Sequence, residues 1–262
     1  MNNLNEKRIL ITGASRGIGE AIARHFAKLG FFTILVARTE IDLARVKREI
    51  INSGGKADYV VSDLSSEEEA NNLSQKVTLN FGFVEYIVLN AGISTNSVFL
   101  SQTNSNFQQE LWVNYLAPLL FLKNILNEMV EKKQGKIVTI SSIAGLLPFP
   151  GNSTYAASKA ALISLSITMN IEFKKHNIYI GSVLPGLTKT SMTKDYESFV
   201  LPFSEPEEIA RCVEEAFQYE KTIVIPGIFN NVITTLYKHF PEPLNILLSS
   251  LTSIFIPSPA TK

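Results

Sequence analysis

The segment Ile9-Leu-Ile-Thr-Gly-Ala-Ser-Arg-Gly-Ile-Gly19 decides the fold of this chain of 262 residues. Its apolar run predicts a buried strand over Arg8–Thr12, and the helical spacing of the apolar residues after it predicts a helix over Ile18–Leu29. Glycines between a strand and a helix allow a tight turn and close approach of a ligand, while the amides at the helix N-terminus attract phosphate. The segment therefore predicts a binding site for a dinucleotide pyrophosphate.

Two other kinds of site share such a loop. A P-loop needs Gly-Lys-Ser/Thr, whereas the last glycine here is followed by Glu20. The string Gly13-Ala-Ser-Arg-Gly17 matches the G-x-S-x-G elbow of serine hydrolases, and Asp195 and His239 follow in the order of a triad. That elbow normally crowns a central strand, but about one predicted strand precedes Ser15. A hydrolase therefore remains an alternative hypothesis.

The rest of the chain alternates predicted strands and helices. Further strands are predicted at Phe32–Ala37, Asp58–Ser62, Tyr86–Leu89, Lys136–Ser141, Tyr179–Leu184 and Thr222–Ile225. Further helices are predicted at Ile41–Ile50, Ser65–Asn80, Phe107–Lys132 with a break near Pro118, Tyr155–Lys174 and Pro206–Phe217. This order predicts an α/β fold with a parallel sheet covered on both faces, in one domain over residues 1–262. The tail after Gly227 is expected to be less regular.

Composition excludes several classes of function. The 24 basic residues balance the 24 acidic ones, which argues against nucleic acid or an acidic membrane as the main partner. The single Cys212 excludes a disulfide framework and a cysteine-rich metal site. The N-terminus lacks an apolar secretory segment. The apolar stretch Leu244–Ile256 is too short for a membrane span, which needs about 20 residues. We expect a cytoplasmic protein without a bound metal or a transmembrane span.

The ends of three predicted strands favour one cofactor. An acidic residue about 20 positions past the glycine loop would bind the ribose hydroxyl of NAD, but Arg38 stands there. Arg38 and Arg16 favour a 2′-phosphate, hence NADP(H), although each could be a solvated surface charge. Asp63 suits either an adenine contact or a helix cap. The small residues of Asn90-Ala-Gly92 would let a flat ring system pass across the sheet edge. Alternatively, this segment marks a turn.

Four residues further along the chain have the chemistry of a proton-transfer site. Tyr155 and Lys159 are four apart on a predicted helix and share one face. A nearby ammonium favours a phenolate, so Tyr155 suits acid–base work near neutrality. Ser142, at a strand end, can hold a substrate oxygen, and Asn114 can anchor a water. Each also has a structural interpretation when taken alone.

Together these motifs resemble the short-chain dehydrogenase/reductase family. The resemblance spans about Lys7 to Thr190 and consists of Thr12-Gly-x-x-x-Gly-x-Gly19, Asn90-Ala-Gly92, Asn114, Ser142, Tyr155-x-x-x-Lys159 and Pro185-Gly186 with Thr190. It implies a Rossmann-type doubly wound sheet of seven strands in the order 3-2-1-4-5-6-7. Leu89 departs from the asparagine that many members carry there. The arginine pair resembles the NADP(H)-preferring branch, and the tail from Ile223 resembles a bacterial oxidoreductase group that includes DltE-like proteins.

The resemblance also implies a reaction, hydride transfer between the nicotinamide and a carbonyl or secondary-alcohol carbon. Tyr155 would be the general acid/base, Lys159 would bind the nicotinamide ribose, Ser142 would position the carbonyl, and Asn114 would hold a relay water. The candidate cofactor-binding residues are Gly13, Ser15, Arg16, Gly17, Ile18, Gly19, Arg38, Asp63, Leu64, Asn90, Ala91, Gly92, Tyr155, Lys159, Pro185, Gly186, Thr188 and Thr190. A protein that binds the dinucleotide without catalysis is a further alternative, which the complete catalytic set disfavours.

Two apolar segments bear on the substrate and on assembly. A predicted lid, 187–205, contains Met192, Tyr196, Phe199, Val200, Leu201 and Phe203. A C-terminal apolar extension, 228–262, adds Leu236, Tyr237, Phe240 and Leu244–Ile256. An apolar lid predicts a hydrophobic ketone or alcohol, while packing on the core or on another subunit is the alternative. The resemblance favours a homodimer or homotetramer built through the helices around Asn114 and Tyr155.

Overall fold

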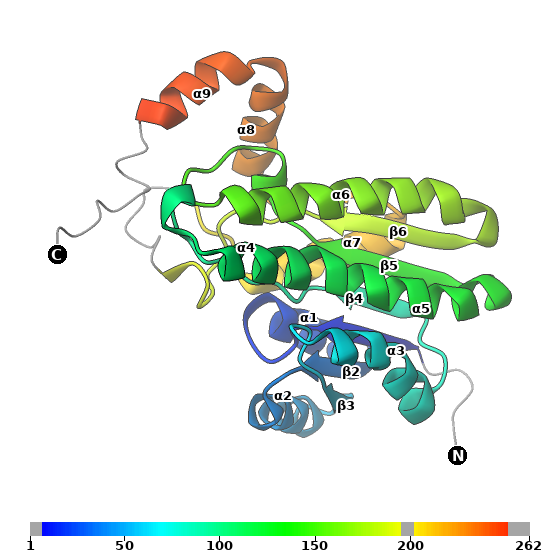
Figure 1. Cartoon of the computed structure of the whole chain (residues 1–262). Coiled ribbons are helices and arrows are strands. Elements are labelled where there is room, and N and C mark those ends of the chain that lie inside the picture. Colours follow the sequence, from blue (N-terminus) through cyan, green and yellow to red (C-terminus); the bar gives the residue numbers. More distant parts are fainter. Residues whose placement is uncertain (1–6, 195–201, 251–262) are drawn as a thin grey trace.

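Parallel strands form the centre of the molecule, a computed structural model that describes residues 7–194 and 202–250. Within these residues one seven-stranded sheet has the order β3-β2-β1-β4-β5-β6-β7 (Figure 1). The strands are β1 (Arg8–Thr12), β2 (Phe32–Ala37), β3 (Lys56–Val61), β4 (Tyr86–Leu89), β5 (Gly135–Ile140), β6 (Ile178–Val183) and β7 (Ile223–Val224). The predicted fold class and strand order are confirmed.

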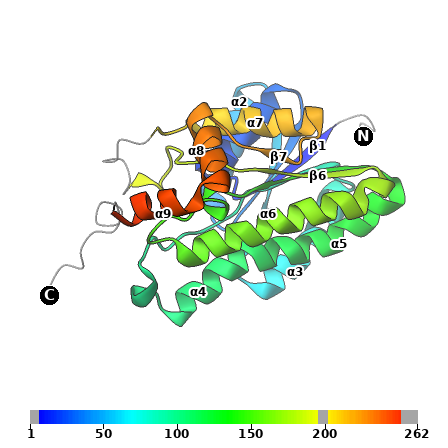
Figure 2. The same ribbon diagram turned by 90° about the horizontal axis from the view of Figure 1, so that it is seen from above.

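Helices cover both faces of the sheet, as Figure 2 shows from above. The helices are α1 (Gly17–Lys28), α2 (Glu40–Asn52), α3 (Glu67–Phe81), α4 (Asn104–Leu111), α5 (Ala117–Lys132), α6 (Ser153–Phe173), α7 (Pro206–Tyr219), α8 (Ile228–His239) and α9 (Pro241–Ser250). One core cluster joins the sheet to α1, α2 and α7, and a second joins it to α3, α5 and α6. Because both faces are covered, β6 is buried along its whole length.

The long helical stretch around Pro118 is broken, as predicted. Helix α4 ends at Leu111, a π-helical turn follows over Trp112–Leu116, and α5 then begins with proline in its first turn. Proline is tolerated there because the first amides of a helix lack intrahelical partners. Helix α4 begins at Asn104, earlier than predicted, because Thr103 caps it by accepting a bond of 3.2 Å from the Asn106 amide.

The prediction of a less regular tail after Gly227 is wrong for the described residues. Helices α8 and α9 follow and project from the body at the side opposite the N-terminus (Figure 1). Helix α8 begins directly after Gly227, which has a φ of +81°, and it buries Asn230 and Thr234. Pro241 stands first in α9, where a missing amide hydrogen costs nothing.

Several residues named above lie outside the described part of the chain. They are Asp195, Tyr196, Phe199, Val200 and Leu201 of the predicted lid and the end of the Leu244–Ile256 stretch. The lid and extension boundaries, and the single domain over 1–262, therefore stay predictions. No helix among the residues described is long and apolar enough to cross a membrane.

Candidate functional site

The glycine loop after β1 requires the absence of side chains. Gly13 and Gly17 have φ angles of +67° and +58°, which glycine adopts readily. A Cβ on Gly19 would lie 2.2 Å from the Gly13 carbonyl oxygen, so helix α1 packs against the loop only with glycine there. Thr12 Oγ1 accepts bonds of 3.0 Å from the amides of Asn90 and Ala91 and joins the loop to the end of β4.

The start of α1 fits a pyrophosphate. The N-cap residue Arg16 has an extended backbone, and its side chain does not cap the helix. The N–H groups of the first turn can therefore donate to an anion. Thr190, from the segment after β6, lies across the same loop, because its Cγ2 would be 3.2 Å from a Cβ on Gly17. These residues lie together at the carboxyl ends of the strands, the place where open α/β sheets bind ligands.

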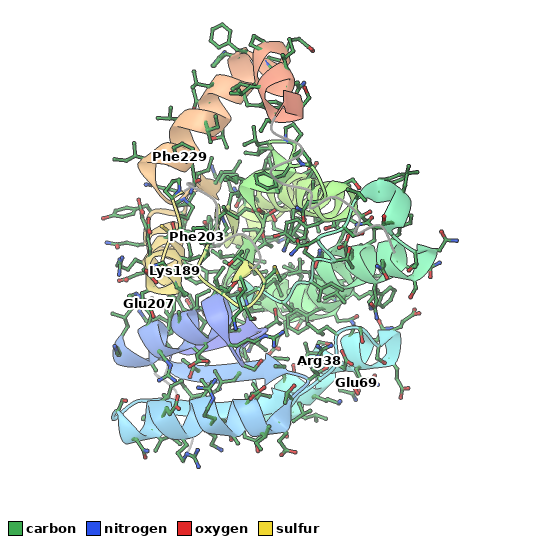
Figure 3. All side chains as sticks on the ribbon, turned by 90° about the vertical axis from the view of Figure 1, so that its left-hand side faces the viewer. Arg38, Glu69, Lys189, Phe203, Glu207 and Phe229 are labelled. Atoms are coloured by element: carbon green, nitrogen blue, oxygen red, sulfur yellow. The ribbon has the colours of Figure 1, made fainter. Side chains whose placement is uncertain are left out.

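Arg16 and Arg38 lie on neighbouring strand ends. Arg38 directly follows β2, and the Ala14 amide donates to the Val36 carbonyl, which brings the glycine loop beside that strand. Both arginine side chains are exposed. Figure 3 shows Arg38 at the same end of the molecule as Glu69 of α3. The two cations therefore remain candidates for a phosphate clamp.

Asp63 shapes the turn before α3 and does not cap this helix, whose N-cap residue is Ser66. Its Oδ1 accepts bonds of 3.0 and 2.9 Å from the amide and hydroxyl of Ser65. Ser66 Oγ accepts from the Glu69 amide at 3.4 Å, whereas Glu69 Oε2 accepts from the Asp63 amide at 2.7 Å. Asp63 and Glu69 together hold the turn between β3 and α3.

Tyr155 and Lys159 face each other on α6. The Lys159 Nζ lies 5.7 Å from the centre of the Tyr155 ring and donates a bond of 3.0 Å to the Ile140 carbonyl. Lys159 is 4% exposed, and burial lowers its pKa from 10.5 to about 8. Ser141 Oγ donates to the Lys159 carbonyl at 2.8 Å and holds α6 against the end of β5. The expected phenol–ammonium pair is therefore present on one helix face.

Asn114 lies in the π-helical turn and is fully buried. Its Oδ1 accepts from the Ile93 amide at 2.8 Å, and its Nδ2 donates to the Ile93 carbonyl at 2.9 Å and to Ser158 Oγ at 3.0 Å. A Cβ on Gly92 would lie 3.2 Å from both Asn114 Oδ1 and Lys159 Nζ, so the end of β4 meets these side chains. The relay water expected at Asn114 stays a prediction.

Ser142 lies at the carboxyl end of β5 beside the segment after β6. Its Oγ accepts from the Ala144 amide at 3.1 Å and donates to the Pro185 carbonyl at 3.4 Å. Thr188 Oγ1 donates to the Gly186 carbonyl at 3.2 Å, and a Cβ on Gly186 would collide with Asn230 of α8 at 2.5 Å. The ends of β4, β5 and β6 thus bring most of the predicted site residues to one edge of the sheet.

Similarity to known proteins agrees with this geometry. The family model described as short chain dehydrogenase matches residues 7–200. The chain belongs to the short-chain dehydrogenase family.

Two relatives and one solved structure illustrate the family. The chain is 34% identical to a fatty acyl-CoA reductase of Acinetobacter baylyi, over 98% of this chain and 88% of that protein. It is 32% identical to the 3-oxoacyl-[acyl-carrier-protein] reductase FabG of Rickettsia typhi, over 81% and 90% of the two chains. A metagenomic short-chain oxidoreductase in complex with NADP superposes with a TM-score of 0.73, at 31% identity, over 85% and 98% of the chains. The resemblance to short-chain dehydrogenases is confirmed, and the DltE-like subgroup stays a prediction.

The hydrolase alternative is not favoured. A nucleophile elbow holds its serine in a sharp, strained turn. Ser15 is not among the described non-glycine residues with positive φ, and Arg45 donates a bond of 3.0 Å to its carbonyl. Membership of the short-chain dehydrogenase family indicates that this loop binds a dinucleotide rather than carrying a nucleophilic serine.

Sequence reasoning missed several polar residues near the site. Glu110 is completely buried on α4 and accepts two bonds from Thr95. Asn96, with a φ of +46°, donates from Nδ2 to the Met192 carbonyl at 3.3 Å and so joins the loop after β4 to the predicted lid. One signal for Glu110 was present in the sequence: it is an acidic residue directly before the apolar run that contains Asn114.

Proposed function

We propose that this short-chain dehydrogenase is an NADP(H)-dependent enzyme that transfers a hydride between the nicotinamide and a carbonyl or secondary-alcohol carbon of an apolar substrate. The observation that carries the proposal is the pairing of Tyr155 with Lys159, whose ammonium lies 5.7 Å from the centre of the phenol ring. When bound, the nicotinamide supplies or accepts the hydride. The chain's own residues then have to hold the oxygen and move its proton.

Tyr155 is the proposed proton donor to the substrate oxygen during reduction and the acceptor during oxidation. The ammonium of Lys159 favours the phenolate, which lowers the cost of moving the proton near neutrality. Ser142, with its hydroxyl held between the Ala144 amide and the Pro185 carbonyl, is placed to orient that oxygen. Lys159 is also the proposed partner of the nicotinamide ribose, and its Nζ lies 3.2 Å from where a Cβ on Gly92 would stand.

The preference for the phosphorylated cofactor rests on Arg16 and Arg38. Both are exposed at neighbouring strand ends, and the residue before Arg38 is Ala37 rather than an acid. A guanidinium binds phosphate through charge-assisted bonds, while a carboxylate at this place would repel it. The metagenomic relative in complex with NADP supports this choice.

The proposal of an apolar substrate rests on apolar side chains in the segment after β6 and at the start of α8. Phe203 is half-buried, Met192 is 38% exposed, and Phe229 at the start of α8 is 47% exposed (Figure 3). The two relatives reported above act, by their names, on fatty acyl-CoA and on 3-oxoacyl groups. We therefore propose a carbonyl compound with an acyl chain as the substrate class.

Assembly and location are part of the same proposal. Helices α4, α5 and α6 lie along one side of the molecule (Figure 2). Leu111 of α4, Leu116 of the π-helical turn and Ile171 of α6 are exposed. Burial of such apolar surface between two copies would stabilise a homodimer or homotetramer. We propose a cytoplasmic enzyme with this assembly. Sedimentation of the purified protein tests the number of subunits.

The experiment that tests the function follows NADPH oxidation with a 3-oxoacyl thioester, a long-chain acyl-CoA and an aryl ketone. Turnover of at least one of them, faster with NADPH than with NADH, is expected. Binding of NADPH without turnover of any would favour a non-catalytic binder. Labelling of Ser15 by a fluorophosphonate would favour a hydrolase.

A further inference from the structure

A chain of polar side chains runs from helix α4 to the start of helix α6. Glu110 Oε1 accepts bonds of 2.5 Å from the Thr95 amide and 2.8 Å from Thr95 Oγ1. Thr95 Oγ1 in turn accepts from Gln102 Nε2 at 3.0 Å, and Gln102 Oε1 accepts from Thr154 Oγ1 at 3.0 Å. Thr154 is the residue before Tyr155. The chain therefore ends next to the proposed acid/base.

In this series of hydrogen-bonded side chains, every hydroxyl and side-chain amide donor points toward Glu110. The Thr154 hydroxyl donates to Gln102, the Gln102 amide donates to Thr95, and the Thr95 hydroxyl donates to the carboxylate. Bonds aligned in one direction polarise and strengthen one another, most of all in a dry environment. Gln102 and Thr154 are each 9% exposed and Glu110 is 0% exposed, so water competes little. The chain therefore holds its members in one arrangement.

The first turn of α6 depends on links of this kind. Its N-cap residue is Asn152, whose side chain does not cap the helix. Asn152 Oδ1 instead lies 3.0 Å from Ser94 Oγ, which shares its one hydrogen with Asn96 Oδ1 at 2.7 Å, and Thr154 donates to Gln102. Both links lead back to neighbouring residues of the loop after β4, Ser94 and Thr95. The position of that loop therefore sets the position of the first turn.

Burial of the Glu110 carboxylate lowers the stability of the fold unless its bonds to Thr95 offset the cost. Its Oε2 is buried and has no hydrogen-bond partner within the described part of the chain. A buried polar atom without a partner destabilises a fold, whereas an apolar side chain of similar size would not. Glu110 and Asn114 stand four residues apart, on either side of the start of the π-helical turn, and fix Thr95 and Ile93 respectively. A carboxylate at 110 is explained by the two bonds that Thr95 donates to it.

We propose that Glu110 is a positioning residue for Tyr155, acting through Thr95, Gln102 and Thr154. The inference rests on the proposed function, in which Tyr155 is the acid/base. Tyr155 is the third residue of α6, while Lys159 lies one turn further on. Loosening of the first turn therefore moves the phenol away from the ammonium as well as away from the substrate oxygen.

The test compares variants that remove or keep the acceptor at position 110. Glu110→Leu removes it, Glu110→Gln keeps a carbonyl oxygen for Thr95, and Thr154→Val removes the hydroxyl at the other end of the chain. Glu131→Leu, at an exposed position of α5, is the control. Three readouts are taken: the phenol pKa from tyrosinate absorbance against the same variant with Tyr155→Phe, hydrogen exchange of the first turn of α6, and turnover of a 3-oxoacyl thioester with NADPH.

We expect Glu110→Leu and Thr154→Val to raise the phenol pKa, to speed exchange in the first turn, and to lower kcat about tenfold, because small displacements of a catalytic group are costly. The Kd for NADPH should change by less than about twofold, because the glycine loop is built separately. Glu110→Gln and Glu131→Leu should behave like the wild type.

Folded Glu110→Leu and Thr154→Val proteins with an unchanged phenol pKa and unchanged exchange would overturn the inference. If Glu110→Leu does not fold, Thr154→Val decides, since it only replaces a hydroxyl by a methyl group. Absence of turnover in the wild type would count against the proposed function alone, because the titration and exchange readouts test the positioning role without turnover.

Discussion

The two sides of the candidate site are built in different ways. The cofactor side depends on side chains that are absent, since Gly13, Gly17 and Gly19 leave room for a turn, a helix and a ligand. The catalytic side depends on side chains held by hydrogen bonds, with Asn114 fixing Ile93 by both ends of its amide. Damage to the first side should therefore appear as lost cofactor affinity, and damage to the second as lost rate.

The largest expected effect is on the catalytic side. Tyr155→Phe removes the hydroxyl that exchanges the proton and should lower kcat by about 10²–10⁴-fold, the usual contribution of general acid–base catalysis. The Kd for NADPH should stay nearly unchanged, which fluorescence titration measures. Retained turnover with the 3-oxoacyl thioester would show that another group moves the proton.

The catalytic side should also lower the stability of the fold. Lys159 is buried and its pKa falls from 10.5 to about 8, so below about pH 8 the folded state carries the full cost of burying the charge. Lys159→Met should therefore raise the free energy of unfolding near pH 7 by up to about 3 kcal/mol, reduced by the lost bond to the Ile140 carbonyl. The gain should shrink as pH rises from about 8 to 10.5, because the wild type then loses its proton in the folded state.

Urea unfolding at several pH values measures this gain, and Lys174→Met, at an exposed position after α6, is the control. A Lys159→Met protein whose stability tracks the wild type at every pH would mean that the ammonium is not desolvated in solution.

The contrast between the two sides explains what the sequence could predict. The strands and helices, the glycine loop and the Tyr155–Lys159 pair follow from local spacing, because glycine, β-strand and helix patterns repeat over a few residues. The order of the strands in the sheet came from the resemblance to the family. The link from Glu110 to Thr154 joins residues 44 positions apart through Thr95 and Gln102, and local spacing contains no trace of it. Helices α8 and α9 are a simpler case, since a glycine such as Gly227 and a proline such as Pro241 end helices as well as precede or begin them.

On the cofactor side, a single added methyl group at Gly19 should weaken cofactor binding. Gly19→Ala places a Cβ about 2.2 Å from the Gly13 carbonyl oxygen, so the loop or helix α1 has to shift. Overpacking of this kind costs about 1–3 kcal/mol, and we expect the Kd for NADPH to rise about tenfold or more, as measured by calorimetry. Gly54→Ala is the control, because its φ of +83° strains alanine while open space surrounds the new carbon. Equal losses of cofactor affinity in both variants would mean that general destabilisation, not the loop, is responsible.

The smallest effect sharpens the cofactor side by testing which dinucleotide it selects. Arg38→Asp replaces a charge-assisted contact to the 2′-phosphate with a repulsive one and should lower the ratio of kcat/KM for NADPH over NADH by about tenfold or more. Lys28→Asp makes the same change of charge at an exposed position at the far end of α1, and the ratio should not move. Since both variants alter the net charge equally, a shift in Arg38→Asp alone isolates a local contact from the general field of the protein. A ratio that stays constant in both would leave Arg16 as the residue that distinguishes the two cofactors.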